Sequence, residues 1–331
     1  MTIFSTPQAR NRLQWGISLT VLIVVLIAAL LSGDLLLTPV QVWDAITGRA
    51  DSFTTTVVLS WRLPRALVAI VFGAALGAAG AVFQTLTRNS LGSPDIIGFN
   101  AGAYTGVLIS LIILPAAGFV VIASAAVIGG LATAAAVLIF SASVGTKGRG
   151  FVLTGIAVSA LLTSLNTWLL YKTDTATATT GSIWAAGTLD NTRWQHATPA
   201  LVALILAATV TALFTRKLHI LALGDDLATS LGLRVRVDRV ILIICAVTLT
   251  AITTAIAGPI LFIALASPHL AKTLLPYGRP VQAAGITGAI LLSCADWIAA
   301  HAFAPTQIPV GAVTVSLGGG YLVLTILFRR Q

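Results

Sequence analysis

The side chains that could perform chemistry are few and widely separated in this sequence. Its four histidines and two cysteines show neither the spacing of a zinc site nor a disulfide framework, and all ten acidic residues are aspartates. A Gly-Lys dipeptide, which a Walker-type phosphate loop requires, does not occur. We therefore expect no covalent chemistry, no metal site and no ATPase site in this chain. The histidines and cysteines are His196, His219, His269, His301, Cys245 and Cys294.

The aspartates also argue against transport driven by protons or sodium. Carriers of that kind usually place carboxylates in the middle of their membrane spans, where the cost of burial implies a function. Here the apolar runs are almost free of acids, and Asp296 is the main candidate. The energy for transport would then come from a partner, most naturally a cytoplasmic ATPase. An ion-coupled carrier that requires Asp296, and a scaffold or receptor that transports nothing, stay as alternatives.

Composition assigns the chain to the membrane. Hydrophobic residues make up 57% of the 331 positions and charged residues only 9%, whereas a soluble protein has about a quarter of its residues charged. The net charge of +9 does not indicate nucleic-acid binding, because the basic residues stand singly or in pairs between apolar runs rather than in one cluster.

The apolar runs predict ten membrane-spanning helices in a single domain of residues 1–331. A helix needs about 20 apolar residues to cross the hydrocarbon core, and lipid tolerates no open backbone, so an all-α fold is expected. Two uncharged stretches of double length are each expected to break into two spans, at Pro115 and Gly118 and at Gly258-Pro259. The spans are expected at about 16–33, 66–87, two within 95–147, 150–171, 196–215, two within 239–272, 281–300 and 310–329.

Orientation follows from the distribution of Lys and Arg between the loops. With a cytoplasmic N-terminus, fourteen of the nineteen Lys and Arg residues fall inside, among them Lys147, Arg329 and Arg330. Both termini are then cytoplasmic. Segments 34–61 and 172–195 lie outside, the second with a short surface helix, and segment 216–239 lies inside.

The inner segment 216–239 predicts a short amphipathic helix. Asp225 and Asp226 suit the positive end of a helix dipole, Gly232 is a plausible C-terminal stop, and Leu227 and Leu231 recur at helical spacing. Such a helix could dock its apolar face in a groove of a partner protein. It could equally lie on the lipid headgroups.

Six short motifs follow one another in a specific order. They are Arg62-Leu-Pro-Arg65, Asn89-Ser-Leu-Gly-Ser-Pro94 with Ile97-Gly98, Leu221-Ala-Leu-Gly-Asp225 with Ala228 and Leu231-Gly232, Gly258-Pro-Ile-Leu-Phe262 with Pro268-His269, Ala295-Asp296, and Pro309-Val-Gly311. In this order, over about four-fifths of the chain, they resemble the FecCD family of importer permeases, which serves ferric siderophores, haem and cobalamin.

The resemblance implies an ATP-binding-cassette (ABC) importer of the bacterial inner membrane that works by alternating access. Two ten-helix permeases would surround the pathway, two ATPase subunits would bind ATP and Mg, and an extracytoplasmic binding protein would deliver the cargo. A paralogue is favoured over an identical copy as the second permease. A ferric siderophore is the expected cargo, with cobalamin or haem as alternatives.

The resemblance also implies roles for individual residues. Arg62 and Arg65, with His301, would dock the binding protein, although arginines at a membrane interface are the alternative. Relatives often have an arginine near His301 and an acid near Gln307, so both positions depart from the pattern. The coupling loop that meets the ATPase would comprise Leu221, Ala222, Leu223, Gly224, Asp225, Asp226, Ala228, Leu231 and Gly232, and the cytoplasmic gate would contain Asn89 and Leu91.

One predicted span has a small, polar face. Gly155, Ser159, Thr163 and Asn166 recur at steps of three and four residues. Similar permeases line the pathway with this helix, whereas close helix packing with hydrogen bonds between helices is the alternative. The sequence leaves both open.

Overall fold

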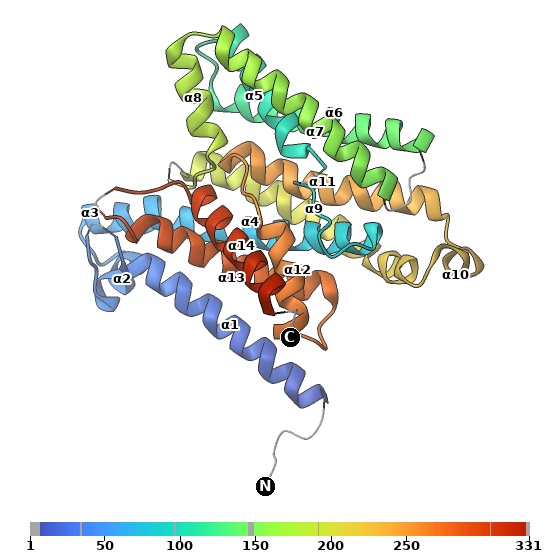
Figure 1. Ribbon diagram of the computed structural model, residues 1–331. Helices are drawn as coiled ribbons and strands as arrows, with labels where there is room; N and C mark the ends of the chain where they lie inside the picture. Colours follow the sequence, from blue (N-terminus) through green and yellow to red (C-terminus); the bar gives the residue numbers. More distant parts are fainter. Residues whose placement is uncertain are drawn as a thin grey trace.

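The computed structural model describes residues 7–33, 35–95, 97–144, 149–190, 192–304 and 306–328, and every regular element within these ranges is a helix. Figure 1 shows long helices running between two ends of the molecule, with α2, α3 and α8 at one end and α10 at the other. The helices are α1 (Pro7–Leu31), α2 (Pro39–Ile46), α3 (Ser52–Thr55), the π-helix η1 (Thr56–Arg62), α4 (Leu63–Thr87), α5 (Phe99–Ile113), α6 (Phe119–Val144), α7 (Arg149–Lys172), α8 (Thr175–Ala185), α9 (Trp194–Ala222), α10 (Asp225–Ser230), α11 (Val235–Ala257), α12 (Ile263–Leu274), α13 (Pro280–His301) and α14 (Val310–Phe328).

A helix lies at each of the ten positions where a span is predicted. Within the described residues, seven helical stretches are long and apolar enough to cross a bilayer by themselves. The other three predicted spans are α5, α12 and α14, with 15, 12 and 19 residues. Both turns expected inside the double-length apolar stretches are confirmed, at residues 114–118 and 258–262. The all-helical prediction is therefore confirmed for the described chain.

Of the three longer connecting segments, two differ from the prediction and one agrees with it. The outer segment 34–61 is largely helical, because α2, α3 and η1 fill it and η1 continues directly into α4. The short helix expected within 172–195 is α8. The inner loop is shorter than 216–239, because the apolar pattern of α9 continues through the buried Leu218 and Leu221. Lys147, Arg329 and Arg330, which contributed to the expected orientation, lie outside the described residues.

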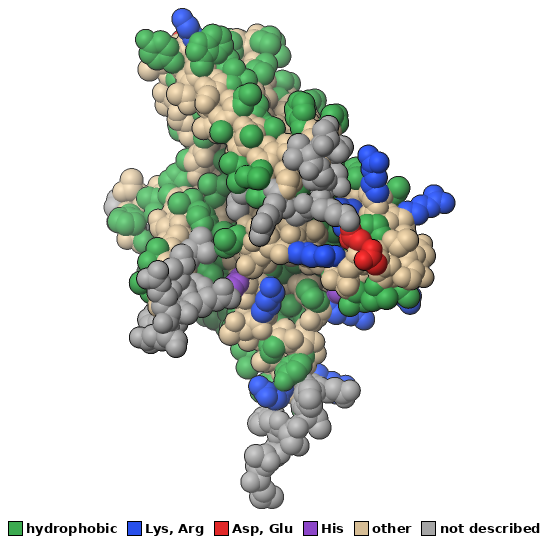
Figure 2. All heavy atoms as spheres, turned by 45° about the vertical axis from the view of Figure 1, so that its right-hand side comes forward, with side chains coloured by type: hydrophobic (Ala, Val, Ile, Leu, Met, Phe, Trp, Pro, Cys, Tyr) green, Lys and Arg blue, Asp and Glu red, His purple; other side chains and the backbone are tan. Residues whose placement is uncertain are grey.

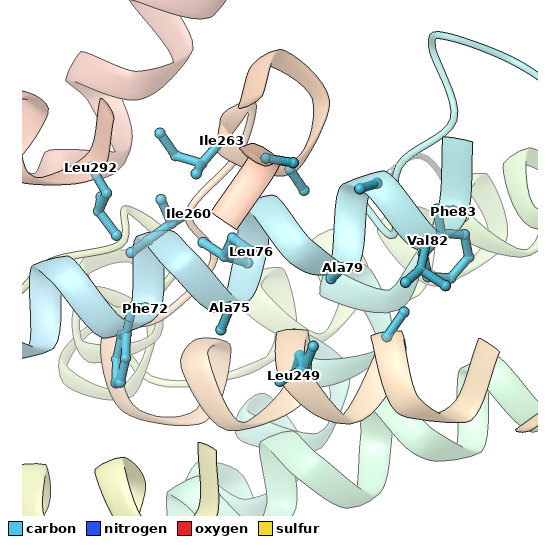
Figure 3. Close-up of a cluster of buried hydrophobic side chains, with 14 of the residues drawn as sticks. Phe72, Ala75, Leu76, Ala79, Val82, Phe83, Leu249, Ile260, Ile263 and Leu292 are labelled. Carbon is cyan, nitrogen blue, oxygen red and sulfur yellow. The ribbon is translucent and has the colours of Figure 1, made fainter. Parts of the chain in front are cut away.

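The centre of the bundle is α4. In the most apolar 18 residues of the stretch Ser52–Thr87, 72% of the residues are buried, whereas in the most apolar 18 residues of α1 only 6% are buried. α4 packs against α9, α11, α12 and α13. Figure 3 shows Phe72, Leu76 and Phe83 of α4 in this core, together with Leu249 of α11 and Leu292 of α13. Because α1 buries so little, its flank is left for lipid or for another chain.

α4 and α13 approach each other closely through small residues. A side-chain carbon at Gly77 would overlap the backbone of Ala284, and one at Gly288 would overlap the backbone of Gly73. Small residues at such spacing allow membrane helices to pack backbone against backbone. The glycines of α4 therefore allow this helix to pack closely against α13.

The surface has two characters. Figure 2 shows hydrophobic side chains over much of the flanks, and Lys and Arg side chains around the end that contains α10, beside an acidic patch. Leu213 and Ile139 are 74% and 68% exposed. Side chains of this size are exposed to that degree where lipid, rather than water, is the solvent.

Candidate functional site

The segment between α9 and α11 presents a row of leucines at one end of the bundle. Leu223, Leu227 and Leu231, four residues apart, are 63%, 48% and 56% exposed. Ala228 is fully buried against the rest of the chain. The amide of Gly232, in the left-handed region at φ 83°, donates to the carbonyl of Thr229, so the predicted stop is confirmed. The result is a one-turn helix with an open apolar ridge.

Five charged side chains hold the base of this segment. An oxygen of Asp225 accepts hydrogen bonds from Arg239 of α11 at 2.8 Å and, more weakly, from Arg88 at 3.4 Å. Asp238 of α11 pairs with Lys217 of α9 at 2.6 Å. These two acids tie the end of α9 and the start of α11 to the turn between them.

The predicted gate residues Asn89 and Leu91 lie at the same end. The amide of Asn89 donates to the Gln84 carbonyl, and its side-chain oxygen accepts a hydrogen bond from the Leu91 amide at 3.0 Å. Leu91 is 52% exposed. Asn89 and Ala222 line one cavity of about 400 Å³, so the candidate gate and the candidate coupling loop are neighbours in space.

At the opposite end, Arg65 is enclosed by groups of the same chain. Its Nε and Nη2 donate to the carboxylate of Asp296 at 2.9–3.1 Å, and its Nη1 donates to Asp190 at 2.8 Å and to Gln307 at 3.0 Å. The side chains of Arg65 and Asp296 are only 17% and 9% exposed. This guanidinium therefore joins α4, α13 and the loop after α8.

The other two predicted docking residues lie beside the same cluster. Arg62 donates from Nη1 to the carbonyl of Leu30 at 2.8 Å, which fixes the end of α1. The Nδ1 of His301 lies 2.7 Å from the carbonyl of Trp297, and the two rings stack with centroids 4.8 Å apart. Arg62, Arg65 and His301 all line one open cavity of about 890 Å³. The structure thus brings together three residues that are distant in the sequence.

The polar face of α7 packs largely against protein. Gly155 faces Ile97, and Ser159 faces the backbone of Gly98. Asn166 is buried, accepts a hydrogen bond from the hydroxyl of Thr105 at 2.7 Å and donates to the carbonyl of Ala101 at 3.0 Å. Thr163 is exposed. Three of the four candidate pathway residues thus lie against α5 or the segment before it.

Asp95 is a buried carboxylate that the spacing arguments missed. One of its oxygens accepts a hydrogen bond from Asn100 at 2.9 Å, and the backbone amide of Phe262 also bonds to the carboxylate. Asn100 in turn accepts a hydrogen bond from Thr254 of α11 at 3.3 Å. The sequence marks Asp95 only as a boundary of an apolar run. Its burial depends on how residues 88–98 fold back against the bundle, which no local pattern reveals.

No group of three or more His, Cys or Asp side chains within the described part of the chain could hold a metal ion. Cys245 and Cys294 are free thiols. His269 lies edge-on to the ring of Tyr321, with centroids 5.7 Å apart, which agrees with a packing role for this histidine.

The fold defines the class of protein. A solved structure described as a metal-chelate type ABC transporter in an inward-facing conformation matches with a TM-score of 0.83 at 23% identity, over 96% of this chain and 99% of that one. A chain in the structure of PsaBC from Streptococcus pneumoniae in complex with Fab matches more distantly, with a TM-score of 0.58 at 17% identity, over 86% of this chain and 94% of that one. The chain therefore shares the helical fold of that ABC transporter structure.

The chain belongs to the FecCD transport family, whose model matches residues 21–329. The ferric enterobactin transport system permease protein FepG of Escherichia coli (strain K12) is 43% identical over 297 residues, 89% of this chain and 90% of that protein. The probable siderophore transport system permease protein YfhA of Bacillus subtilis (strain 168) is 30% identical, over 95% of this chain and 94% of that protein.

Membership of this family confirms the resemblance seen in the motifs. The chain is a multi-pass membrane permease of a bacterial ABC importer. ATP is bound by partner ATPase subunits, so the permease has no catalytic site of its own, and its partners include an ATPase and a binding protein.

Proposed function

We propose that this permease passes a ferric siderophore into the cell. The observation that carries the proposal is the 43% identity to FepG over 90% of that protein, whose name specifies ferric enterobactin. The achromobactin transport system permease protein CbrC of Dickeya dadantii, 32% identical over 96% of this chain, adds a second siderophore system. Iron travels inside its chelator, so the permease needs shape and weak polar contacts rather than metal ligands.

We infer that α10 faces the cytoplasm and seats in a cleft of the ATPase, with both termini on that side of the inner membrane. Lys and Arg are concentrated in the loops on that side, as the positive-inside rule requires. Leu227 and Leu231 have the helical spacing that groove-binding helices use, and Leu223 extends the apolar ridge from the end of α9 across the turn at Gly224. Movement of the segment from Leu221 to Gly232 would reach the gate at Asn89, which lines the same cavity as Ala222, and through Asn89 the neighbouring Leu91.

The opposite end would receive the binding protein. Arg62, Arg65 and His301 form a basic and aromatic rim, and charges of this kind mainly speed encounter and fix orientation. Arg65 is already paired, so an acid of the binding protein would compete with Asp190, which is 34% exposed. Alternating access between the two ends would then move the cargo along a pathway to which the α7 residues Gly155, Ser159, Thr163 and Asn166 belong.

The working complex would contain two ATPase subunits, this chain, a second FecCD permease and an extracytoplasmic siderophore-binding protein. A paralogous second permease is favoured over a second copy of this chain. The surface of this chain that contacts the second permease would lie on the apolar flanks of the bundle.

Uptake by the complete complex in lipid vesicles tests the proposal. Labelled ferric enterobactin, haem and cobalamin are offered with the binding protein, with and without ATP. We expect ATP-dependent uptake of the ferric siderophore alone. ATP-dependent uptake of only cobalamin or haem overturns the choice of cargo, and uptake without ATP overturns the importer mechanism.

A matched pair of variants tests the coupling loop within that assay. Leu227→Asp is expected to abolish ATPase binding, because it places a charge on the apolar ridge. Leu213→Asn, at an exposed position on the flank of α9, leaves the ridge intact and is expected to keep ATPase binding. Equal ATPase binding by Leu227→Asp and the unaltered chain would show that α10 is not the docking helix.

A further inference from the structure

The short helix α10 has little packing to connect it to the bundle. It packs chiefly on α9 and α11, its neighbours in the chain, and only Ala228 of its six residues is buried. A force applied to α10 by a partner must therefore pass through side-chain contacts or through the chain at either end. Asp225, the first residue of α10, makes the contacts that reach farthest.

A single carboxylate oxygen of Asp225 is shared by two guanidinium groups. Arg239 approaches to 2.8 Å and is 13% exposed, whereas Arg88 approaches to 3.4 Å and is 58% exposed. The first pair is held in place by its surroundings. The second is loose and solvated, and such pairs are weak enough to be broken and remade.

The two arginines belong to different parts of the molecule. Arg239 lies in the first turns of α11, only 14 residues from Asp225 in the chain, while Arg88 is 137 residues away and ends α4, the central helix. Arg88 adopts the left-handed conformation, with φ 50° and ψ 36°, and turns the chain into segment 88–98. Asn89 and Leu91 follow directly.

We propose that Asp225 is a positioning residue that transmits displacement of α10 to the end of α4 and to the segment that contains Asn89 and Leu91. Arg239 fixes Asp225 to α11 as α10 tilts, and Arg88 follows the carboxylate. The inference rests on the proposed seating of α10 in an ATPase. It adds to that seating a specific route from the ATPase to the permease interior, with one acid and two arginines as its parts.

The decisive variant is Arg88→Gly. Glycine adopts the left-handed conformation without strain, and the pair between Asp225 and Arg239 stays intact, so the loop keeps its anchor. Asp225→Asn is the companion variant. Arg216→Gln is the control, because Arg216 is an exposed basic residue of α9 that lies outside both the coupling loop and the gate.

The complete complex in vesicles is assayed for three quantities: ATPase subunits bound, ATP hydrolysed, and cargo taken up per ATP. Arg88→Gly and Asp225→Asn are expected to bind ATPase and hydrolyse ATP, while cargo per ATP falls about tenfold, within the range of measured couplings between sites. Arg216→Gln is expected to leave that ratio unchanged.

The outcomes separate this inference from the proposed function. If Leu227→Asp loses ATPase binding but Arg88→Gly keeps a normal ratio of cargo to ATP, α10 docks the ATPase and the route through Asp225 is overturned. If Arg88→Gly and Asp225→Asn lose ATPase binding together, Asp225 shapes the docking surface and transmits nothing. If Leu227→Asp binds ATPase normally, the coupling loop itself is misassigned.

Discussion

Arg65 of α4 and Asp296 of α13 join these two helices, because two nitrogens of the guanidinium donate to the same carboxylate. The Nε–oxygen distances are 3.0 and 3.1 Å and the Nη2–oxygen distance is 2.9 Å, between residues 231 positions apart. Asp296 was the strongest candidate for an ion-coupling acid in the sequence. Because Arg65 already pairs with Asp296 inside the chain, this carboxylate has a fixed cationic partner, which favours the ATP-driven mechanism.

We predict that removing either partner alone destabilises the protein strongly. Arg65→Ala leaves Asp296 as a buried charge without its partner, and losses of this kind cost about 3–5 kcal/mol. The double variant Arg65→Met with Asp296→Leu removes both charges and is expected to regain most of the stability. Thermal unfolding of the purified protein in detergent measures the difference.

Arg49→Ala serves as the control for this series. Arg49 is exposed in the outer segment, and its loss is expected to change stability by less than about 0.5 kcal/mol. A double variant as unstable as Arg65→Ala would mean that shape, rather than charge balance, governs this site.

The close contact between α4 and α13 gives a second prediction. In Gly77→Ala the new carbon meets the carbonyl group of Ala284, and because this obstacle is backbone it has no rotamer that would relieve the overlap. We expect a loss of about 1–3 kcal/mol, as for other overpacked sites. Gly16→Ala in α1, where no atom lies within 4 Å of the new carbon, is the control. Equal unfolding temperatures for the two variants would contradict a tight crossing.

Helix positions could be predicted from the sequence because lipid imposes a length and excludes charge. The double-length apolar stretches needed a break, and Pro115 and Gly258-Pro259 marked where the chain turns. The one-turn helix at Asp225 was visible for similar reasons: acids at its start, glycine after its end and leucines at helical spacing.

Long-range partners were not predictable in the same way. Nothing near Arg65 in the chain indicates that Asp190 and Asp296 enclose it, because both pairs form only when α13 and the loop after α8 pack on α4. The burial of Asp95 likewise depends on the path of the segment between α4 and α5. The π-helical turns before α4 were also missed, since β-branched and aromatic residues there gave no distinct signal.

A third prediction separates packing from pathway lining on α7. Asn166→Leu removes two hydrogen bonds to α5, and bonds of this kind between membrane helices contribute about 0.6–1.7 kcal/mol. We expect Asn166→Leu to lower the stability. Thr163→Ala is expected to leave the stability unchanged, because Thr163 is exposed and its hydroxyl bonds only to the carbonyl of Ser159 within the described chain.

Thr163→Cys then tests the pathway directly. In a background with Cys245 and Cys294 changed to Ala, a water-soluble thiol reagent is expected to label this cysteine in the complete complex and to block uptake. Lack of labelling in both the resting and the ATP-bound complex would remove this face of α7 from the pathway.

The last prediction concerns the outer helix α8 and pH. The carboxylate of Asp174 caps α8 by accepting the Thr177 amide hydrogen at 2.9 Å, and this hydrogen bond lowers the pKa of Asp174 below its ordinary value of 3.8. Because the charged form is favoured in the folded state, the cap contributes fully at neutral pH. Its contribution is lost as the pH falls through the lowered pKa. Asp174→Asn keeps a capping oxygen but cannot titrate, whereas Asp174→Ala has no cap at any pH.

Hydrogen exchange of the α8 amides, normalised to the intrinsic rate at each pH, measures this cap. Protection in the unaltered protein is expected to fall toward that of Asp174→Ala on acidification, while Asp174→Asn stays nearly constant. Parallel loss of protection in the unaltered protein and in Asp174→Asn would assign the acid sensitivity to another group. Since α8 stacks Trp184 on Tyr104 of α5, with ring centroids 5.9 Å apart, fraying of its first turn need not release the helix from the bundle. The effect should therefore be confined to the amides nearest Asp174.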